Sequence, residues 1–426
     1  MKSNSYPLLY AIIILFFAAC KERFEPAIDT PSTGYLVVEG NINSGNGPTV
    51  IKLSRTGRLN LGGRAEKGAE VQIVGEDLST YNLTGNDNGV YTSAVLNLPK
   101  QRYRLRIKAG GKEYLSELLA EKQTPSIDSV SWQRVAEGVK LYVHTHDDSN
   151  KTKYYKWTFE ETWEIRSELE AFYRFKTTVI PNRRNVVTVV RTTPKEQELL
   201  YYCWKSEASN EILLGSTAKL AKDVMIFPLK LIRNNDERLV FLYSINVVQT
   251  ALDIRSYNFY QNLKANTESN GSIFDRQPSE ISSNIKCVNN PAEMVIGNVM
   301  LTSHTEKRIF IYNPSNWVNS FVCNPSIAPT REDMFHNPDT LAKYNGPHIP
   351  LSTTEAEENT PLHPDSAAIY SRFAPLTGFY APRVPAAYAH LFPPPKPYII
   401  GYTMGNRSCV DCTLRGTNVK PSFWPR

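Results

Sequence analysis

Alternation of apolar and polar residues constrains the fold of this chain more than any other feature of its sequence. Between residues 34 and 124 the alternation has a period of two, as in Tyr103, Leu105 and Ile107. Because neighbouring side chains of a β-strand point to opposite faces, such runs predict half-buried strands. Turn-forming residues at 86–89 and 109–112 separate the runs. We therefore expect residues 34–124 to form an immunoglobulin-like β-sandwich of about seven strands.

The polar face of one expected strand is basic. Arg102, Arg104, Arg106 and Lys108 share this face. Such a row could contact anionic lipid head groups or an acidic partner, but it is more typical of a solvated strand face, which we favour. The other basic residues are dispersed and the net charge is only +6, so we expect no nucleic-acid partner.

A second, larger β-rich domain is expected over residues 125–426. Alternating runs continue at 139–143 and 155–159, and further β-rich runs follow. One amphipathic helix is expected at about residues 253–268, where apolar residues recur at helical spacing. Asp253 can cap its first turn. The predicted fold class is thus mainly β: a sandwich, then a larger β-rich domain with one amphipathic helix.

Residues 324–398 have a different character. They hold 14 of the 28 prolines and show no sustained period. Because proline removes a backbone donor and fixes φ, this composition predicts an extended, proline-rich loop region. Long loops often bind ligands. Four aromatic residues could contact a sugar or a peptide here, or could belong to a structural wrap around the core: Tyr380, Tyr388, Phe392 and Tyr398.

The N-terminus contains a short apolar run. Residues 8–19 reach only about 18 Å as a helix, too short for a hydrocarbon core of about 30 Å. The run is typical of a secretory signal, predicted over residues 1–19. Cys20 follows small residues, as in a bacterial lipobox, so we expect Cys20 to carry the lipid that attaches the chain to the membrane. An ordinary signal peptide with a chance cysteine is the alternative. Residues 20–33 are polar, contain prolines and predict a tether.

Five further cysteines follow in the chain. In an exported protein they tend to be oxidised, and five cannot all pair internally. The segment after the last two predicts turn and extended chain, which favours a structural role over a redox pair. Zinc bound by Cys287, Cys323, Cys409 and Cys412 is a further alternative. The five candidates for disulfides or metal binding are Cys203, Cys287, Cys323, Cys409 and Cys412.

Other candidate sites are weak. His144 and His146 precede two aspartates and could begin a metal site, but Asx turns account for Asp147 and Asp148 without a metal. The sequence contains no nucleophile elbow, Walker loop, dinucleotide-binding glycine motif or His-Glu-x-x-His motif. Carboxylates such as Glu160 and Glu161 could act as a glycosidase pair only if their separation in space allowed it. We expect no cofactor, no metal and no enzymatic activity.

Three blocks resemble the core of a known family: GSIFDRQP at 271–278, NPAEMVIG at 290–297 and CVDCTLRGTN at 409–418. The family comprises outer-membrane lipoproteins of Bacteroidota catalogued as a domain of unknown function. The resemblance implies a lipoprotein of the outer membrane, often associated with TonB-dependent receptors. It implies no reaction and no catalytic residue.

The expected function follows from the anchor, the β modules and the resemblance. We expect a lipid-anchored, non-enzymatic accessory protein of the outer membrane that works with a TonB-dependent uptake receptor. A structural or adhesive module of the cell surface is the first alternative. A hydrolase without a recognisable motif is the second.

Overall fold

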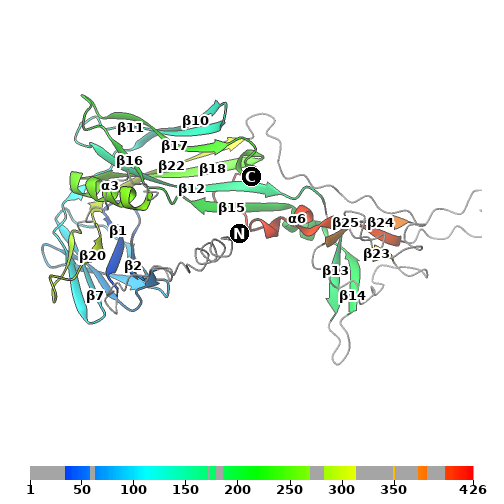
Figure 1. The fold of residues 1–426 in the computed structure, drawn as a ribbon, viewed down its shortest axis with the longest axis horizontal. Helices are drawn as coiled ribbons and strands as arrows, with labels where there is room; N and C mark the ends of the chain where they lie inside the picture. The colour runs from blue at the N-terminus through cyan, green and yellow to red at the C-terminus, as the bar shows by residue number, and fades with distance from the viewer. Residues whose placement is uncertain are drawn as a thin grey trace, which may run out of the picture. The chain divides into compact units, whose positions relative to one another are not determined.

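Two compact units make up the computed structural model. It describes residues 34–57, 63–170, 172–178, 186–268, 283–312, 349–350, 373–380 and 399–425. Unit 1 comprises Met1–Ala120 and Ile281–Leu301, and unit 2 comprises Glu121–Glu280 and Thr302–Arg426. The predicted signal segment, Cys20 and the tether lie outside the described residues. Strands dominate both units (Figure 1), so the prediction of a mainly β protein is confirmed.

Unit 1 is a curled sheet that encloses one hydrophobic core. Its strand order is β19-β8-β7-β4-β5-β6-β2-β1, with β20 beside β1 and β3 beside β2. The predicted alternation is confirmed: Tyr103, Leu105 and Ile107 are buried, whereas the residues between them are not. The specifically immunoglobulin-like arrangement stays a prediction. The strands are β1 (Leu36–Asn43), β2 (Pro48–Arg55), β3 (Arg64–Ala65), β4 (Glu70–Gly75), β5 (Thr80–Gly85), β6 (Val90–Val95), β7 (Tyr103–Ala109), β8 (Lys112–Ser116), β19 (Ile285–Cys287) and β20 (Val295–Gly297).

Residues 281–301 belong to unit 1, although the sequence analysis placed them in the second domain. β19 pairs with β8, and β20 pairs in parallel with β1. Gly297 allows this approach, because its φ is +151° and a Cβ there would lie 2.4 Å from the carbonyl oxygen of Val38. The prediction was wrong because local periodicity does not show which distant strand a segment pairs with.

Glu293 fastens this returning segment to the rest of unit 1. The Tyr114 hydroxyl donates to Glu293 Oε1 at 2.7 Å, and Lys112 and Arg55 lie close to the same carboxylate. Burial alone would raise the pKa of Glu293, but Lys112, Tyr114 and Arg55 together hold it below its ordinary value. Burial, together with the bond to Glu293, raises the pKa of Tyr114 to about 12.

The basic row on β7 faces carboxylates. Arg102 pairs with Glu76 on the neighbouring chain segment. Two further ion pairs join Arg106 to Glu113 at 2.5 Å and Lys108 to Glu70 at 3.0 Å. Because three of the four basic side chains are paired, the row agrees with the solvated-face interpretation rather than with a lipid-binding patch.

Unit 2 packs a three-stranded sheet against a five-stranded sheet. The three-stranded sheet has the order β10-β11-β17, and the five-stranded sheet has the order β15-β12-β18-β22 with β16 beside β12. The long strands β12 and β18 run side by side in Figure 1. Their bounds are β10 (Ile127–Val135), β11 (Gly138–His146), β12 (Tyr154–Arg166), β15 (Tyr202–Ala208), β16 (Leu213–Ser216), β17 (Val224–Arg233), β18 (Leu242–Leu252) and β22 (His304–Tyr312).

Alternate residues of β12 form the centre of the unit 2 core. Tyr155, Trp157 and Phe159 are buried and share one apolar cluster with Leu141 and Val143 of the three-stranded sheet. The Trp157 indole N–H donates to a buried side-chain oxygen of Gln249 at 2.8 Å, so its polar atom is satisfied.

A buried carboxylate continues the same row of β12. Glu161 is 2% exposed, and its Oε1 accepts a hydrogen bond from the Tyr243 hydroxyl at 2.8 Å. Lys230 of β17 forms an ion pair with Oε2, and the Arg238 Nε lies 3.7 Å from Oε1. Burial raises the pKa of the Tyr243 phenol, and the charge of Glu161 adds to this effect. Glu160, the preceding residue, points to the opposite face and is half exposed.

The described part of unit 2 contains the expected helix, a four-residue helix at Arg407–Val410 and an additional eight-residue helix that was not expected. α3 (Ile254–Glu268) confirms the prediction, and Asp253 accepts a hydrogen bond from the Ser256 amide at 2.7 Å. The additional helix is α2 (Pro194–Tyr201), which starts with a capping box between Thr193 and Glu196. The signal Thr-Pro-Lys-Glu was present in the sequence and was missed, since the helix is short and has no buried face.

The remaining elements of unit 2 are short. A hairpin pairs β13 with β14, and a small sheet has the order β23-β25-β24. β23 and β24 fall within residues 324–398, so that region is not loop throughout; a register shift near Pro375 hides the alternation. These elements are β9 (Glu121–Lys122), β13 (Tyr173–Thr178), β14 (Val186–Arg191), β21 (Leu301–Thr302), which spans the unit boundary, β23 (Ile349–Pro350), β24 (Phe373–Tyr380), β25 (Ile399–Asn406), α6 (Arg407–Val410), η1 (Glu237–Leu239) and η5 (Cys412–Leu414).

Within the described residues, no helix is both long and apolar enough to cross a membrane.

Candidate functional site

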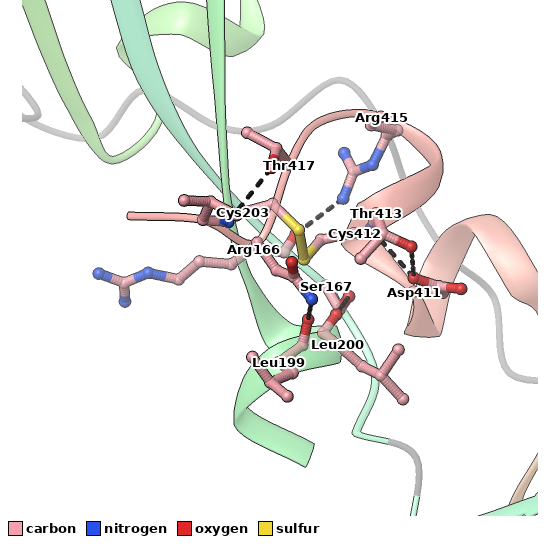
Figure 2. Close-up of a disulfide and its surroundings, with 12 residues drawn as sticks. Arg166, Ser167, Leu199, Leu200, Cys203, Asp411, Cys412, Thr413, Arg415 and Thr417 are labelled. Atoms are coloured by element: carbon pink, nitrogen blue, oxygen red, sulfur yellow. Dashed lines mark hydrogen bonds between the residues drawn. A yellow bond between two sulfur atoms is a disulfide. The ribbon is translucent and has the colours of Figure 1, made fainter. Parts of the chain in front are cut away.

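A disulfide between Cys203 and Cys412 connects β15 to the C-terminal part of the chain (Figure 2). The two residues are 209 positions apart in sequence, and their Cα atoms are 5.6 Å apart. Both side chains are fully buried. Cys203 belongs to the unit 2 core, and Cys412 joins the same cluster, so the bond lies in the core rather than on the surface.

The local sequence explains why Cys412 sits where it does. Asp411 Oδ1 accepts a hydrogen bond from the Thr413 amide at 3.0 Å and caps the short turn η5, as Figure 2 shows. The Arg415 Nη2 donates to the Arg166 carbonyl at 2.8 Å. Close packing requires glycine at position 416, because a Cβ there would lie 2.6 Å from the backbone oxygen of Trp204. The Cys-Thr-Leu-Arg-Gly run is therefore a docking element for the sheet.

Backbone pairing continues directly after this turn. The amides and carbonyls of Trp204 and Thr417 exchange two hydrogen bonds of 2.8 Å. Farther along, Trp424 is 6% exposed and packs edge-on against Trp204 and Phe310. Together with Leu242, these residues form an apolar cluster on the five-stranded sheet.

A third segment, residues 166–169, is hydrogen-bonded to the C-terminal end of α2 and to Cys409. The Ser167 amide donates to the Tyr201 carbonyl at 3.0 Å, and its hydroxyl donates to the Leu200 carbonyl at 2.7 Å. The Leu169 amide donates to the Cys409 carbonyl at 3.1 Å. We call the disulfide with residues 166–169, 199–204 and 409–418 the latch. The latch thus joins three parts of the chain: the residues just before position 170, those just after position 198, and those that follow β25.

An open hollow lies beside the latch. Its cavity volume is about 10 Å³, room for about one water molecule, whereas ligand pockets are usually about 300–1,000 Å³. The hollow therefore does not indicate a small-molecule site. Its lining comprises Glu164, Ile165, Arg166, Glu237, Val240, Phe241 and Arg415.

The structure decides between the alternatives for the cysteines. Cys412 bonds to Cys203, so Cys409 and Cys412 are not a redox pair with each other. The four-cysteine zinc alternative is wrong for the same reason, because the Cys412 sulfur is not available as a thiolate. Cys409 is disulfide-bonded as well, and Cys287 is a buried free thiol in unit 1. Cys323 lies outside the described residues.

The histidines of β11 have local partners. His144 lies 2.7 Å from the Ser131 hydroxyl, and His146 lies 2.8 Å from Asp128. Asp147 accepts hydrogen bonds from the amides of Ser149 and Thr152, as expected for an Asx turn. Burial alone would raise the pKa of Asp147, but these hydrogen bonds hold it well below its usual range. In the part of the chain that the structure describes, no group of three or more His, Cys, Asp or Glu side chains is arranged to bind a metal ion.

The predicted binding loop is represented by one residue. Tyr380 ends β24, while Tyr388, Phe392 and Tyr398 lie outside the described residues. The partner of Cys412 was not predictable from the sequence, although Cys203 and Cys412 were both candidates for disulfide bonds. No local signal connects residues so far apart.

Fold and latch together define a disulfide-bonded, β-rich protein of two compact units. Comparison with protein families then gives its membership: the family described as "Domain of unknown function (DUF4249)" matches residues 21–308. The chain belongs to this family. The matched range includes Cys203 and ends before Cys412.

Two other comparisons add little. No curated protein matches the chain. One similar solved structure is a protein of Bacteroides uniformis provisionally described as carbohydrate-binding. The two sequences are 10% identical, and the match covers 51% of this chain and 90% of that protein, with a TM-score of 0.14. That score is too low for the likeness to support any argument about fold or ligand.

Proposed function

We propose that this protein is a lipid-anchored accessory protein of the bacterial outer membrane, non-enzymatic, that assists uptake through a TonB-dependent receptor. The observation that carries the proposal is the latch. A buried disulfide between Cys203 and Cys412, with Cys409 also oxidised, suits an exported protein, since cytosolic thiols are kept reduced. The short apolar run that ends before Cys20 supports the same compartment.

In this proposal Cys20 carries the anchor. Each buried CH₂ of an acyl chain stabilises membrane attachment by about 0.8 kcal/mol, so two or three chains hold the protein almost permanently. Residues 20–33 act as the tether, and the folded units remain in water. The aromatic residues of the proline-rich region contact the ligand or the receptor: Tyr380, Tyr388, Phe392 and Tyr398.

Replacement of Cys20 tests the anchor. We expect Cys20→Ala to move the protein from the membrane fraction to the soluble fraction, because the lipid has no attachment point. Cys287→Ala is the matched control, since Cys287 is a free thiol buried in unit 1. Membrane attachment that persists in Cys20→Ala would refute lipidation.

Affinity purification from detergent-solubilised membranes tests the partner. We expect a TonB-dependent receptor to copurify with the wild-type chain. Recovery should fall when Tyr388 and Phe392 are both replaced by Ala. Repeated purifications without any receptor would refute the proposal. Normal uptake in a deletion strain, together with lost surface adhesion, would favour the structural or adhesive alternative.

One observation bears on the hydrolase alternative. Glu160 and Glu161 lie on opposite faces of β12, and Glu161 is buried by Lys230, Tyr243 and Arg238. These two carboxylates therefore cannot flank one glycosidic bond.

A further inference from the structure

The last residues of the chain form a strap over the five-stranded sheet. We define the strap as residues 411–425, which follow the disulfide-bonded Cys409. Several of its contacts with the rest of unit 2 lie within six residues of Cys412. They are the bond to Cys203, the hydrogen bond from Arg415 to Arg166, the backbone pair of Thr417 with Trp204, and a hydrogen bond from the Asn418 side chain to the Leu199 carbonyl at 3.1 Å.

Beyond these contacts, two neighbouring aromatic residues, Phe423 and Trp424, attach the strap to the sheet. Trp424 is 6% exposed and covers Trp204, which is itself 8% exposed. Two other apolar side chains of the strap face solvent, since Leu414 is 55% and Val419 is 70% exposed. Phe423 is 38% exposed, and the Arg308 guanidinium of β22 lies 3.6 Å from the centroid of its ring. The apolar surface that the strap buries thus comes mainly from Cys412, Phe423 and Trp424, and its burial requires the strap to be held close to the sheet.

The disulfide holds the strap in the correct register. Cys203 directly precedes Trp204, and Trp204 is the residue that receives both the backbone pair and the Trp424 ring. A covalent bond at Cys203 raises the effective concentration of Thr417 and Trp424 at their sites without adding any contact. Without the bond, ordering of the strap residues would cost conformational entropy that these few hydrogen bonds do not offset.

We propose that the strap is a redox-locked closure: it docks on the five-stranded sheet when Cys203 and Cys412 are joined, and lifts from the sheet when they are reduced. Lifting exposes Trp204, Leu242 and Phe310 to solvent. The three-stranded and five-stranded sheets of unit 2 stay folded in either state, because the strap contributes no strand to them and Cys412 is its one side chain in their shared apolar cluster. The closure is thus a local two-state element on a stable support.

Closure is a balanced thiol–disulfide exchange. The thiols of Cys203 and Cys412 lose two protons and two electrons as their S–S bond forms. A disulfide of a thiol–disulfide oxidoreductase takes up both and is reduced to two thiols. The order of events in the cell, open before export and closed afterwards, rests on the proposed function. The dependence of the strap on the disulfide is a property of the purified chain.

Hydrogen exchange measured by mass spectrometry tests the closure. The compared proteins are the oxidised wild type, the double variant Cys203→Ser/Cys412→Ser and the control Cys287→Ser. We expect amides of strap peptides, including that of Thr417, to exchange at least about tenfold faster in the double variant, while those of β11 and β17 keep wild-type protection. The control should match the wild type throughout the strap.

Three results would overturn the inference. Unchanged protection of Thr417 in the double variant would show that the strap docks without the bond. Equal loss of protection in the strap and in β11 would show that the disulfide staples the whole unit. Failure of Cys203→Ser/Cys412→Ser to fold would also show that the disulfide staples the whole unit, provided that Cys203→Ala/Cys412→Ala, which buries no hydroxyl, fails to fold as well. Since purified protein suffices, these results are separable from those of the anchor tests.

Discussion

Glu161 provides the most demanding test of the reasoning about unit 2. Its carboxylate is 2% exposed and accepts from Tyr243, while Lys230 and Arg238 supply opposite charges. Glu161→Gln keeps the size of the side chain and removes its charge. The change removes the carboxylate that pairs with Lys230, whereas Arg238 keeps its ion pairs with Asp236 and Glu207.

The structure sets the size of the expected effect. Removal of one partner from a buried ion pair costs about 3–5 kcal/mol. The Lys230 side chain is 27% exposed and can turn partly to water, so we expect the lower end, about 3 kcal/mol of unfolding free energy. Lys230→Met in the Glu161→Gln background should recover part of the loss, because the two residues are in contact and their effects are not additive.

Urea unfolding followed by tryptophan fluorescence measures this loss. All six tryptophans fall within the range of unit 2, so the signal reports on that unit. Glu160→Gln is the matched control: its side chain is 51% exposed on the other face of β12, and we expect a change within about 0.5 kcal/mol. A Glu161→Gln loss below about 1 kcal/mol, or an equal loss in Glu160→Gln, would refute the assignment of Glu161 as a buried structural charge.

Three further predictions concern single positions. Gly416→Ala should loosen the strap and speed hydrogen exchange at Trp204, because the new Cβ would lie 2.6 Å from a Trp204 backbone oxygen; unchanged exchange would contradict this. Glu293→Gln should flatten the acid dependence of unit 1 stability. The pKa of Glu293 is depressed in the folded state, so its contribution to stability is fully present above the unfolded-state pKa of about 4.3 and is lost as the pH falls through the folded-state pKa. Protection of β1 amides from hydrogen exchange at pH 7 and pH 3 measures this contribution. An equal loss of protection in the wild type and in Glu293→Gln would refute the role of Glu293. Thr193→Ala should destabilise α2 by about 1 kcal/mol, because Thr193 and Glu196 form a capping box; hydrogen exchange of the α2 amides should quicken, whereas equal protection would show that the cap contributes nothing.

Much of the fold could be predicted because its signals are local. The buried set Tyr103, Leu105 and Ile107 follows from period-two alternation, and the span of α3 follows from spacing and from the cap at Asp253. The missed helix α2 also carried a local signal, the Thr193 to Glu196 capping box. Its eight residues bury no side chain, so the helical period that marks longer helices was absent.

The candidate site was less predictable than the fold. Cysteine composition and a predicted export signal indicated oxidation, but they left the pairing of Cys412 open among four other cysteines. The roles of Arg415 and Gly416 cannot be interpreted from the sequence. They become clear only when Arg166 and Trp204 are known to lie against them. Sequence patterns alone did not distinguish a docking element from a turn.

By itself, the sequence determined which faces of its strands are apolar and where α3 begins, and its predicted export signal led us to expect oxidised cysteines. Tertiary structure alone decided that residues 281–301 return to unit 1, that Cys203 meets Cys412, and that Glu161 rather than Glu160 is buried. The physical reason is range. Alternation and capping act between residues a few positions apart, whereas a contact between residues 209 positions apart depends on the path of the whole chain between them.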